Sequence, residues 1–343
     1  MSRVLVAMSG GVDSSVATAL LRDQGHDVTG VTLKLWGGES DSGCCSVSDV
    51  EDARRVAAQL DVPHYVFNFS EDFDDTIVDP YVQAYADGRT PNPCIECNRS
   101  MKWGRLLDRA RAMGFDALAT GHHARITHDT STGEAELRRG EDPAKDQSYV
   151  LAVLGQDELA MTLLPVGEMT KADVRGHAAR LGLRTATKAE SMDVCFITRG
   201  GRTAFLDARV PPAPGDVVDA DGMVLGAHEG VRAFTVGQRR GLAVATGERR
   251  YVVDVDATTA TVTLGDRRDL LRDTVAFTRP TFTGAPIAAG VSVLVQVRSH
   301  GESHVATWFE DHLEWETPQP RVAPGQTLAF YEADRVLGSA IAT

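Results

Sequence analysis

Residues 3–15 read RVLVAMSGGVDSS and contain the transition on which the fold of the N-terminal half depends. The apolar run RVLVAM (3–8) is typical of a short buried strand, and SSVATALLRDQG (14–25) has the periodicity of a helix with a glycine stop. Gly10 and Gly11 stand between them and allow a tight turn whose backbone N–H groups point at one anion. The start of the helix adds partial positive charge. The stretch therefore predicts a phosphate-binding turn where open α/β sheets bind ligands, at the carboxyl end of a strand.

This turn contains no lysine. The pattern G-x-x-x-x-G-K-[ST] of loops that transfer a γ-phosphate is absent, and the hydroxyls of Ser9, Ser14 and Ser15 are the available donors. Glycines without a lysine suit a pyrophosphate held as a unit, with Asp13 helping to position Mg²⁺. From this stretch alone, a plain turn before a serine-capped helix stays an alternative.

The same alternation of strand and helix continues through the first 120 residues. DVTGVTL (27–33) is a second strand, Ser48 and Glu51 form a capping box before a helix, and HYVFNF (64–69) is a third strand. Helices are expected over 71–86 and 98–113, before ALAT (117–120). Strands separated by helices predict an α/β fold with a doubly wound parallel sheet. With the turn at residues 9–15, this order resembles that of the adenine-nucleotide α-hydrolases.

After residue 200 the sequence changes character. The loop PPAPGD (211–216) is followed by short alternating segments such as RRYVVDVD, ATVTLGD, VSVLVQV, HVATWF and TLAFYEA. Their short spacing favours antiparallel sheets or barrels. We expect an ATP-binding domain with the reactive cysteines over 1–200, a small β-rich central domain over 201–275, and a C-terminal β-barrel over 276–343.

Composition limits the class of protein. The chain has 343 residues, 43% of them hydrophobic and 24% charged, and a net charge of −13. No apolar run is long enough to span a bilayer, and the start has no signal-peptide pattern, so we expect a cytoplasmic protein without a membrane partner. The negative charge weighs against a nucleic-acid partner unless basic residues are gathered locally.

Five cysteines, at positions 44, 45, 94, 97 and 195, predict reactive or metal-binding thiols rather than a disulfide scaffold. Cys94 and Cys97 have the C-x-x-C spacing, and Cys97 is expected at the start of a helix, where a thiol pKa falls. Cys195 is distant in sequence, but thiols that meet in a fold can pass a sulfur atom or form a transient disulfide. The residues alone leave open small buried cysteines, a redox pair, or a zinc or iron–sulfur site made by the other four.

Six motifs that occur in order reduce the number of possible functions. They are SGGVDSS (9–15), GRTPNPCIECNRSMKW (88–103), ATGHHAR (119–125), KDQSYVL (145–151), SMDVCFI (191–197) and FTVGQRRGL (234–242). The first resembles the loop of ATP-dependent adenylating enzymes that cleave ATP between the α and β phosphates. Together, and nearly end to end, the six resemble the bacterial family of tRNA-specific 2-thiouridylases.

This resemblance implies a reaction. The enzyme would adenylate O2 of the wobble uridine (position 34) in the anticodon stem-loop of tRNA with Mg·ATP, releasing pyrophosphate. Persulfide sulfur from a donor or sulfur-relay protein would then replace the oxygen, giving 2-thiouridine and AMP. Cys195 would carry the persulfide, and Cys97 would resolve it through a Cys97–Cys195 disulfide. An iron–sulfur cluster is an alternative that the resemblance does not favour.

The resemblance also implies binding residues. Nucleotide binding would fall to Ala7, Met8, Ser9, Gly10, Gly11, Val12, Asp13, Ser14, Ser15, Leu33 and Gly121. Contacts with tRNA would fall to Asn92, Pro93, Cys94, His122, Lys145, Asp146, Gln147, Arg298, Ser299 and Gln326. An extruded base would meet the first three of these, because it must leave its stack to be modified.

The chain departs from the family at two places. Cys94 stands where relatives often have an aspartate that is proposed to assist proton transfer, and Ser299 and His300 stand where tyrosine and arginine are often found. Two other functions stay open: an adenylating amidotransferase or ligase acting on a small molecule, and a metal-holding sulfur carrier or tRNA-binding protein without turnover. Cys195 separates them best, because neither alternative needs it.

Overall fold

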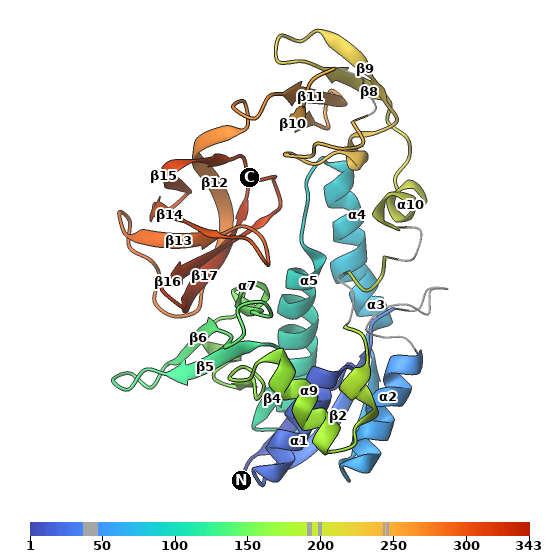
Figure 1. Cartoon of the computed structure of the whole chain (residues 1–343), viewed down its shortest axis with the longest axis vertical. Coiled ribbons are helices and arrows are strands. Elements are labelled where there is room, and N and C mark those ends of the chain that lie inside the picture. The colour runs from blue at the N-terminus through green and yellow to red at the C-terminus, as the bar shows by residue number, and fades with distance from the viewer. Residues whose placement is uncertain (37–46, 191–193, 198–200, 243, 245–246) are drawn as a thin grey trace.

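Figure 1 shows the computed structural model of the chain, which describes residues 1–36, 47–190, 194–197, 201–242, 244 and 247–343. The N-terminal unit occupies the lower part of the view, the C-terminal barrel lies beside its upper part, and the small central unit lies at the top. Cys44, Cys45 and the first three residues of SMDVCFI lie outside the described residues.

A parallel five-stranded sheet forms the centre of the N-terminal unit, as the alternating pattern predicts. Its order is β3-β2-β1-β4-β7, with bounds His64–Asn68, Asp27–Lys34, Arg3–Ala7, Ala117–Ala119 and Thr162–Leu163. Leu5 of β1 packs into the core on one face, and Val4 and Val6 pack into the core on the other. Both faces are therefore covered, which is why β1 is a continuous apolar run.

The face with Val4 and Val6 is covered by α1 (Val12–Asp23), α2 (Val47–Gln59) and α9 (Lys171–Arg180), which contribute Val16, Val56 and Val174. The opposite face is covered by helical turns between residues 70 and 112. These are α3 (Ser70–Phe73), η1 (Asp74–Val78), α4 (Asp79–Ala86), α5 (Pro93–Glu96), η2 (Cys97–Leu106) and α6 (Leu107–Ala112). Both η1 and η2 are π-helical, a form that is rare and often occurs at functional sites.

One helix begins earlier than the sequence predicts. The helix expected from residue 98 begins at Pro93, because the Asn92 side chain accepts hydrogen bonds from the N–H groups of Cys94 and Ile95 and proline suits the first helical position. Cys94, and not Cys97, therefore lies in the first turn. The field of a helix N-terminus fades within that turn. The expectation that it acts on Cys97 is therefore wrong.

Shorter elements complete this unit and the next. The hairpin β5 (Ala124–His128) and β6 (Ala135–Arg139) is followed by α7 (Ser148–Leu151), α8 (Gln156–Leu159), η3 (Arg184–Thr187) and α10 (Gly201–Asp207). The central unit has a four-stranded sheet of order β10-β11-β8-β9, with bounds Tyr251–Asp256, Thr261–Gly265, Gly215–Val218 and Val224–His228, and the turn η4 (Val231–Ala233).

The C-terminal strands close into a six-stranded barrel, which confirms the predicted fold class. Around the barrel the order is β12-β15-β14-β13-β16-β17, and β17 pairs again with β12. The bounds are Leu271–Phe282, His312–Pro320, Ser303–Trp308, Ser292–Gln296, Thr327–Glu332 and Arg335–Ala342. The β5–β6 hairpin of the N-terminal unit joins this sheet through the Arg335–Arg138 register, a pairing that the sequence pattern does not indicate.

The barrel and the N-terminal unit share one apolar core. Tyr331 of β16 is fully buried in the same cluster as Leu137 and Tyr149. The Tyr149 hydroxyl donates to the carbonyl of Thr327 at 3.0 Å, and the Tyr331 hydroxyl lies 3.2 Å from Ser148 Oγ. This continuous packing fixes the barrel against the edge of the N-terminal unit.

All three units meet at Thr90, just before the C-x-x-C segment. Its N–H donates to the carbonyl of Pro324 in the barrel at 2.7 Å, and its carbonyl accepts from the Gln326 side chain. Its hydroxyl lies 3.3 Å from that of Thr235 in the central unit. The loop that leads into the helix of Cys94 and Cys97 is thereby anchored by both β-rich units.

Candidate active site

A cavity of about 380 Å³ opens at the carboxyl ends of the parallel strands. It is lined by the β1–α1 turn, the end of β2, the start of η2, the loop after β4, the first residue of α9, and the barrel loop at Ser299 and His300. Cys94, Cys97 and Cys195 also line it. The fold thus brings Cys195, which is distant in sequence, together with Cys94 and Cys97 in the cavity of the predicted phosphate turn.

Most of the residues expected to bind nucleotide line this cavity: Ala7, Met8, Ser9, Gly11, Val12, Asp13, Ser14, Leu33 and Gly121. Gly10 and Ser15 lie behind them and shape the turn. Gly10 has φ +73°, and a Cβ there would lie 2.3 Å from the carbonyl oxygen of Asp49. A Cβ on Gly121 would lie 2.5 Å from Ser14 N, so only glycine lets the loop after β4 approach the first turn of α1.

Asp13 is the charged centre of the turn. His123 Nε2 lies 3.0 Å from one of its oxygens, and Lys171 Nζ lies 2.8 and 2.7 Å from the two. Burial by itself raises the pKa of Asp13, but the hydrogen bonds from His123 and Lys171 and the charge of Lys171 hold it below its ordinary value. Asp13 is therefore ionised and accepts a hydrogen bond from His123 Nε2–H.

A second carboxylate extends this network towards Cys195. Glu190 accepts from Lys145 Nζ at 2.7 Å and lies 3.6 Å from Lys171 Nζ. Lys188 is held separately: its Nζ donates to Asp49 and Asp52 at 2.7 Å and to the carbonyl of Gly10 at 3.0 Å. Lys188 and Glu190, which precede Cys195, are thus held by ion pairs, Lys188 to α2 and Glu190 to Lys145 and Lys171.

The residue after Cys195 is an aromatic anchor. Phe196 is buried, with its ring 5.7 Å from that of Phe73 and 5.3 Å from those of Tyr81 and Phe205. Burial of this ring fixes the chain on one side of Cys195 and leaves the half-buried cysteine facing the cavity. Sequence reasoning did not identify this anchor, although FI after the cysteine is an apolar signal.

His122, expected to contact tRNA, lies in the cavity wall as a neutral ring. Lys102 Nζ lies 3.4 Å from its Nε2, and Thr120 Oγ1 lies 2.7 Å from its Nδ1. Because an ammonium only donates, Nε2 is the acceptor and the proton is on Nδ1. Burial, and then the neighbouring Lys102, lower the pKa of His122 well below its ordinary value. In this position His122 offers shape and a fixed tautomer rather than charge.

The other residues expected to contact tRNA divide into two groups. Pro93, Cys94, Lys145, Gln147 and Ser299 line the cavity, and Arg298 is exposed beside it on the barrel. Asn92, Asp146 and Gln326 instead use side-chain atoms in internal hydrogen bonds. Their contact with RNA stays a prediction.

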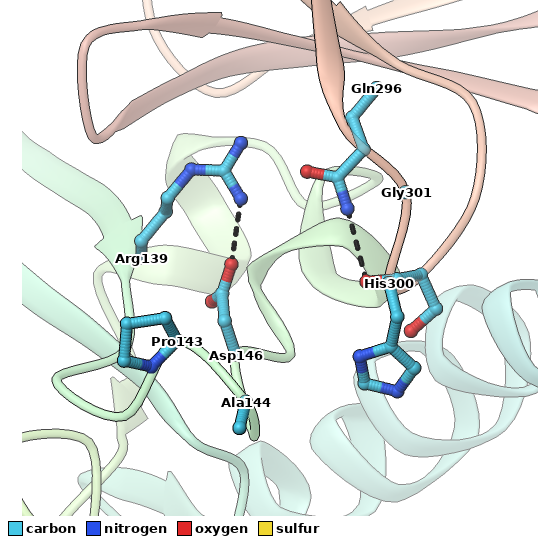
Figure 2. A pocket seen from close by; sticks show the side chains of 8 residues that line it. Arg139, Pro143, Ala144, Asp146, Gln296, His300 and Gly301 are labelled. Carbon is cyan, nitrogen blue, oxygen red and sulfur yellow. Dashed lines mark hydrogen bonds and ion pairs between the residues drawn. The ribbon is translucent and has the colours of Figure 1, made fainter.

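Asp146 lies in a second hollow, of about 360 Å³, between the N-terminal unit and the barrel. Figure 2 shows Arg139 and Asp146 on one side of this hollow and Gln296 and His300 on the other. Arg139 donates to Asp146 at 2.9 Å, and Gln296 donates to the carbonyl of Ser299 at 3.0 Å. The Gln296 bond holds the barrel loop that reaches the main cavity.

Within the described ranges, no group of three or more His, Cys, Asp or Glu side chains is arranged to hold a metal ion. Two members of the four-cysteine site that the sequence leaves open, Cys44 and Cys45, lie outside those ranges. None of the helices in the described part of the chain has the length and apolar character that crossing a bilayer requires.

A parallel α/β sheet with a glycine turn at its central strand, an acidic group beside it and cysteines in the same cavity is the arrangement expected of an adenylating enzyme. Three family models match in order: a tRNA methyl transferase HUP domain over residues 2–199, a tRNA methyl transferase PRC-barrel domain over 203–266, and an aminomethyltransferase β-barrel domain over 272–342.

Curated relatives are similar over nearly the whole chain. The tRNA-specific 2-thiouridylase MnmA of Mycolicibacterium vanbaalenii is 48% identical and that of Roseiflexus castenholzii 44%, each over 98% of both chains. The MnmA of Moorella thermoacetica is 43% identical over 97% of both. The chain belongs to the family of tRNA-specific 2-thiouridylases, which confirms the family expected from its six motifs.

Proposed function

We propose that this protein is an ATP-dependent tRNA-uridine 2-sulfurtransferase, which acts in the cytoplasm on the wobble uridine of tRNA. The observation that carries the proposal is one cavity that contains the glycine turn with Asp13 and, facing it, Cys97 and Cys195. Adenylation and sulfur transfer need these groups in one place, because the adenylated base must meet the sulfur before water reaches it.

In the first step O2 of the uracil attacks the α-phosphorus of Mg·ATP, pyrophosphate leaves, and the N3 proton is lost. The backbone N–H groups of the turn and the hydroxyls of Ser9 and Ser14 would hold the leaving phosphates. Asp13 would face the magnesium ion that arrives with the nucleotide, since Mg²⁺ takes one or two carboxylates together with phosphate oxygens. Adenylation converts a poor leaving group, a carbonyl oxygen, into AMP.

In the second step the outer sulfur of a persulfide on Cys195 attacks C2, and AMP leaves with the original oxygen. The Cys97 thiolate then attacks the inner sulfur of Cys195. A Cys97–Cys195 disulfide forms, and the electron pair of the broken S–S bond stays with the new C2 thiocarbonyl. An external thiol must reduce the disulfide, and a persulfide donor or sulfur-relay protein must reload Cys195.

The test is pyrophosphate release from ATP with and without unmodified tRNA, repeated for Cys97→Ser and Cys195→Ser. We expect release that needs tRNA and survives both substitutions, with 2-thiouridine formed only by the wild type supplied with a persulfide donor. Release that ignores tRNA would instead support a small-molecule ligase. An absence of release would support a carrier or binding protein.

A further inference from the structure

The phosphate turn lacks a cation of its own, although its expected ligand is a polyanion. Between residues 3 and 15 the only basic side chain is Arg3, at the opposite end of β1. The turn instead contributes a negative charge through Asp13, and Glu190 adds another to the same cavity. A triphosphate entering this cavity needs positive charge from elsewhere in the fold.

Lys171 supplies that charge from far along the chain. It is the first residue of α9, and its Nζ lies 2.8 and 2.7 Å from the two oxygens of Asp13. Its side chain is 13% exposed and lines the cavity together with Ser9, Gly11 and Ser14. The ammonium therefore stands at the turn itself and faces the space above it.

The base of this lysine is held firmly. Its backbone N–H donates to Asp142 at 3.0 Å, and Thr170 caps α9 through reciprocal bonds with Asp173. The helix packs against α1 through the core that contains Val16 and Val174. Only the flexible side chain needs to move for the ammonium to reach a bound phosphate.

Three other lysines are less suited to this task. Lys188 is locked between Asp49 and Asp52 behind the turn, and Lys102 lies on the far wall against His122. Lys145 is 34% exposed and is paired with Glu190. Lys171 is the one described lysine paired with the carboxylate of the turn.

We propose that Lys171 is the phosphate-binding cation of the nucleotide site, which takes the place of the lysine that the turn itself lacks. The inference rests on the proposed function, because it assumes that ATP is the ligand. Before ATP binds, Asp13 neutralises the ammonium. When phosphates arrive, Lys171 exchanges the carboxylate for a phosphate oxygen, while Asp13 keeps its bond to His123. The pair thus keeps a cation ordered at the site.

Calorimetric titration of Lys171→Gln with Mg·ATP and with adenosine tests this directly. We expect ATP affinity to fall roughly 10- to 100-fold, the size of one charge-assisted hydrogen bond, and adenosine affinity to stay within about twofold of wild type. Lys171→Arg keeps the charge and should bind ATP more tightly than Lys171→Gln. Lys34→Gln, at the exposed end of β2, is the matched control and should change neither affinity.

The possible failures are distinguishable. If the wild type binds Mg·ATP and Lys171→Gln binds it equally well, Lys171 is not the phosphate cation. If Lys171→Gln loses ATP and adenosine to the same extent, its role is structural, and the inference is again overturned. A wild type that binds adenosine and ATP equally, or neither, would overturn the proposed function together with the inference.

Discussion

Replacing Asp146 by alanine separates two roles for a residue that the sequence assigns to tRNA contact. In the structure its carboxylate is 7% exposed and lies at the joint between the N-terminal unit and the barrel. It accepts from Gly140 N at 2.9 Å, Ser148 N at 3.0 Å and Ser148 Oγ at 2.9 Å, as well as from Arg139. We expect the substitution to act on stability first.

The size of the effect follows from these partners. Truncation leaves two backbone N–H groups and one guanidinium without their acceptor, at about 1–3 kcal/mol for each buried group. Breaking a buried ion pair costs about 3–5 kcal/mol. Arg139 is 27% exposed, and its guanidinium also stacks on the Tyr331 ring at 3.8 Å. Water and the ring therefore offset part of the free energy lost with the ion pair. We expect a net loss of about 3 kcal/mol.

The assay is thermal unfolding followed by tryptophan fluorescence, beside a separate titration with tRNA. A loss of about 3 kcal/mol lowers Tm by roughly 6–12 °C in a unit of this size. Asp146→Asn is the matched control, because its amide oxygen still accepts from Gly140 and Ser148 while the charge is lost, and it should cost about 1 kcal/mol. An Asp146→Ala protein with an unchanged Tm and weakened tRNA binding would refute this reasoning and favour a direct RNA contact.

Three further changes have defined outcomes. Gly325→Ala should lower the free energy of unfolding in urea by about 1–3 kcal/mol, because Gly325 has φ +90° and a Cβ would lie 3.2 Å from Thr90 N. Gly222→Ala is the control: Gly222 has φ +83° but no atom near a Cβ, so this substitution should cost less. Lys188→Met should lower stability by about 1–3 kcal/mol, since two carboxylates then face each other, and an unchanged Tm would contradict it. His122→Gln should flatten the pH dependence of the free energy of unfolding below pH 6.5. The folded protein keeps this ring neutral, so acid favours the unfolded wild-type chain by up to about 1.4 kcal/mol per pH unit. Equal slopes of stability against pH in wild type and variant would show that the ring titrates normally.

Much of the fold follows from local patterns in the sequence. The strand, glycine turn and helix of residues 3–23 are each specified by neighbouring residues, and so are the alternating strands of the barrel. The sequence predicts this helix to begin at residue 98, later than its observed start at Pro93, because the apolar periodicity of NRSMKW is stronger than the signal of a single asparagine cap. Element type was therefore easier to predict than element boundary.

The site was accessible from sequence only in part. The turn glycines, Gly121 and the cysteines that line the cavity stand in motifs, so their types and order indicate chemistry. Lys171 stands in no motif that points to a phosphate, and its capping box indicates only the start of a helix. Phe196 and Thr90 likewise act through partners that spacing does not reveal.

The sequence by itself determined the alternation of strands and helices, the glycine turn after the first strand and the family, because these depend on residues close in the chain or on ordered motifs. Tertiary structure alone decided that Lys171, 158 positions from Asp13, neutralises the turn, and that a hairpin of the first unit extends the barrel sheet. Such contacts form when whole helices and strands pack to bury apolar surface, and this packing decides which charged side chains meet. The spacing of residues along the chain does not indicate which elements pack together.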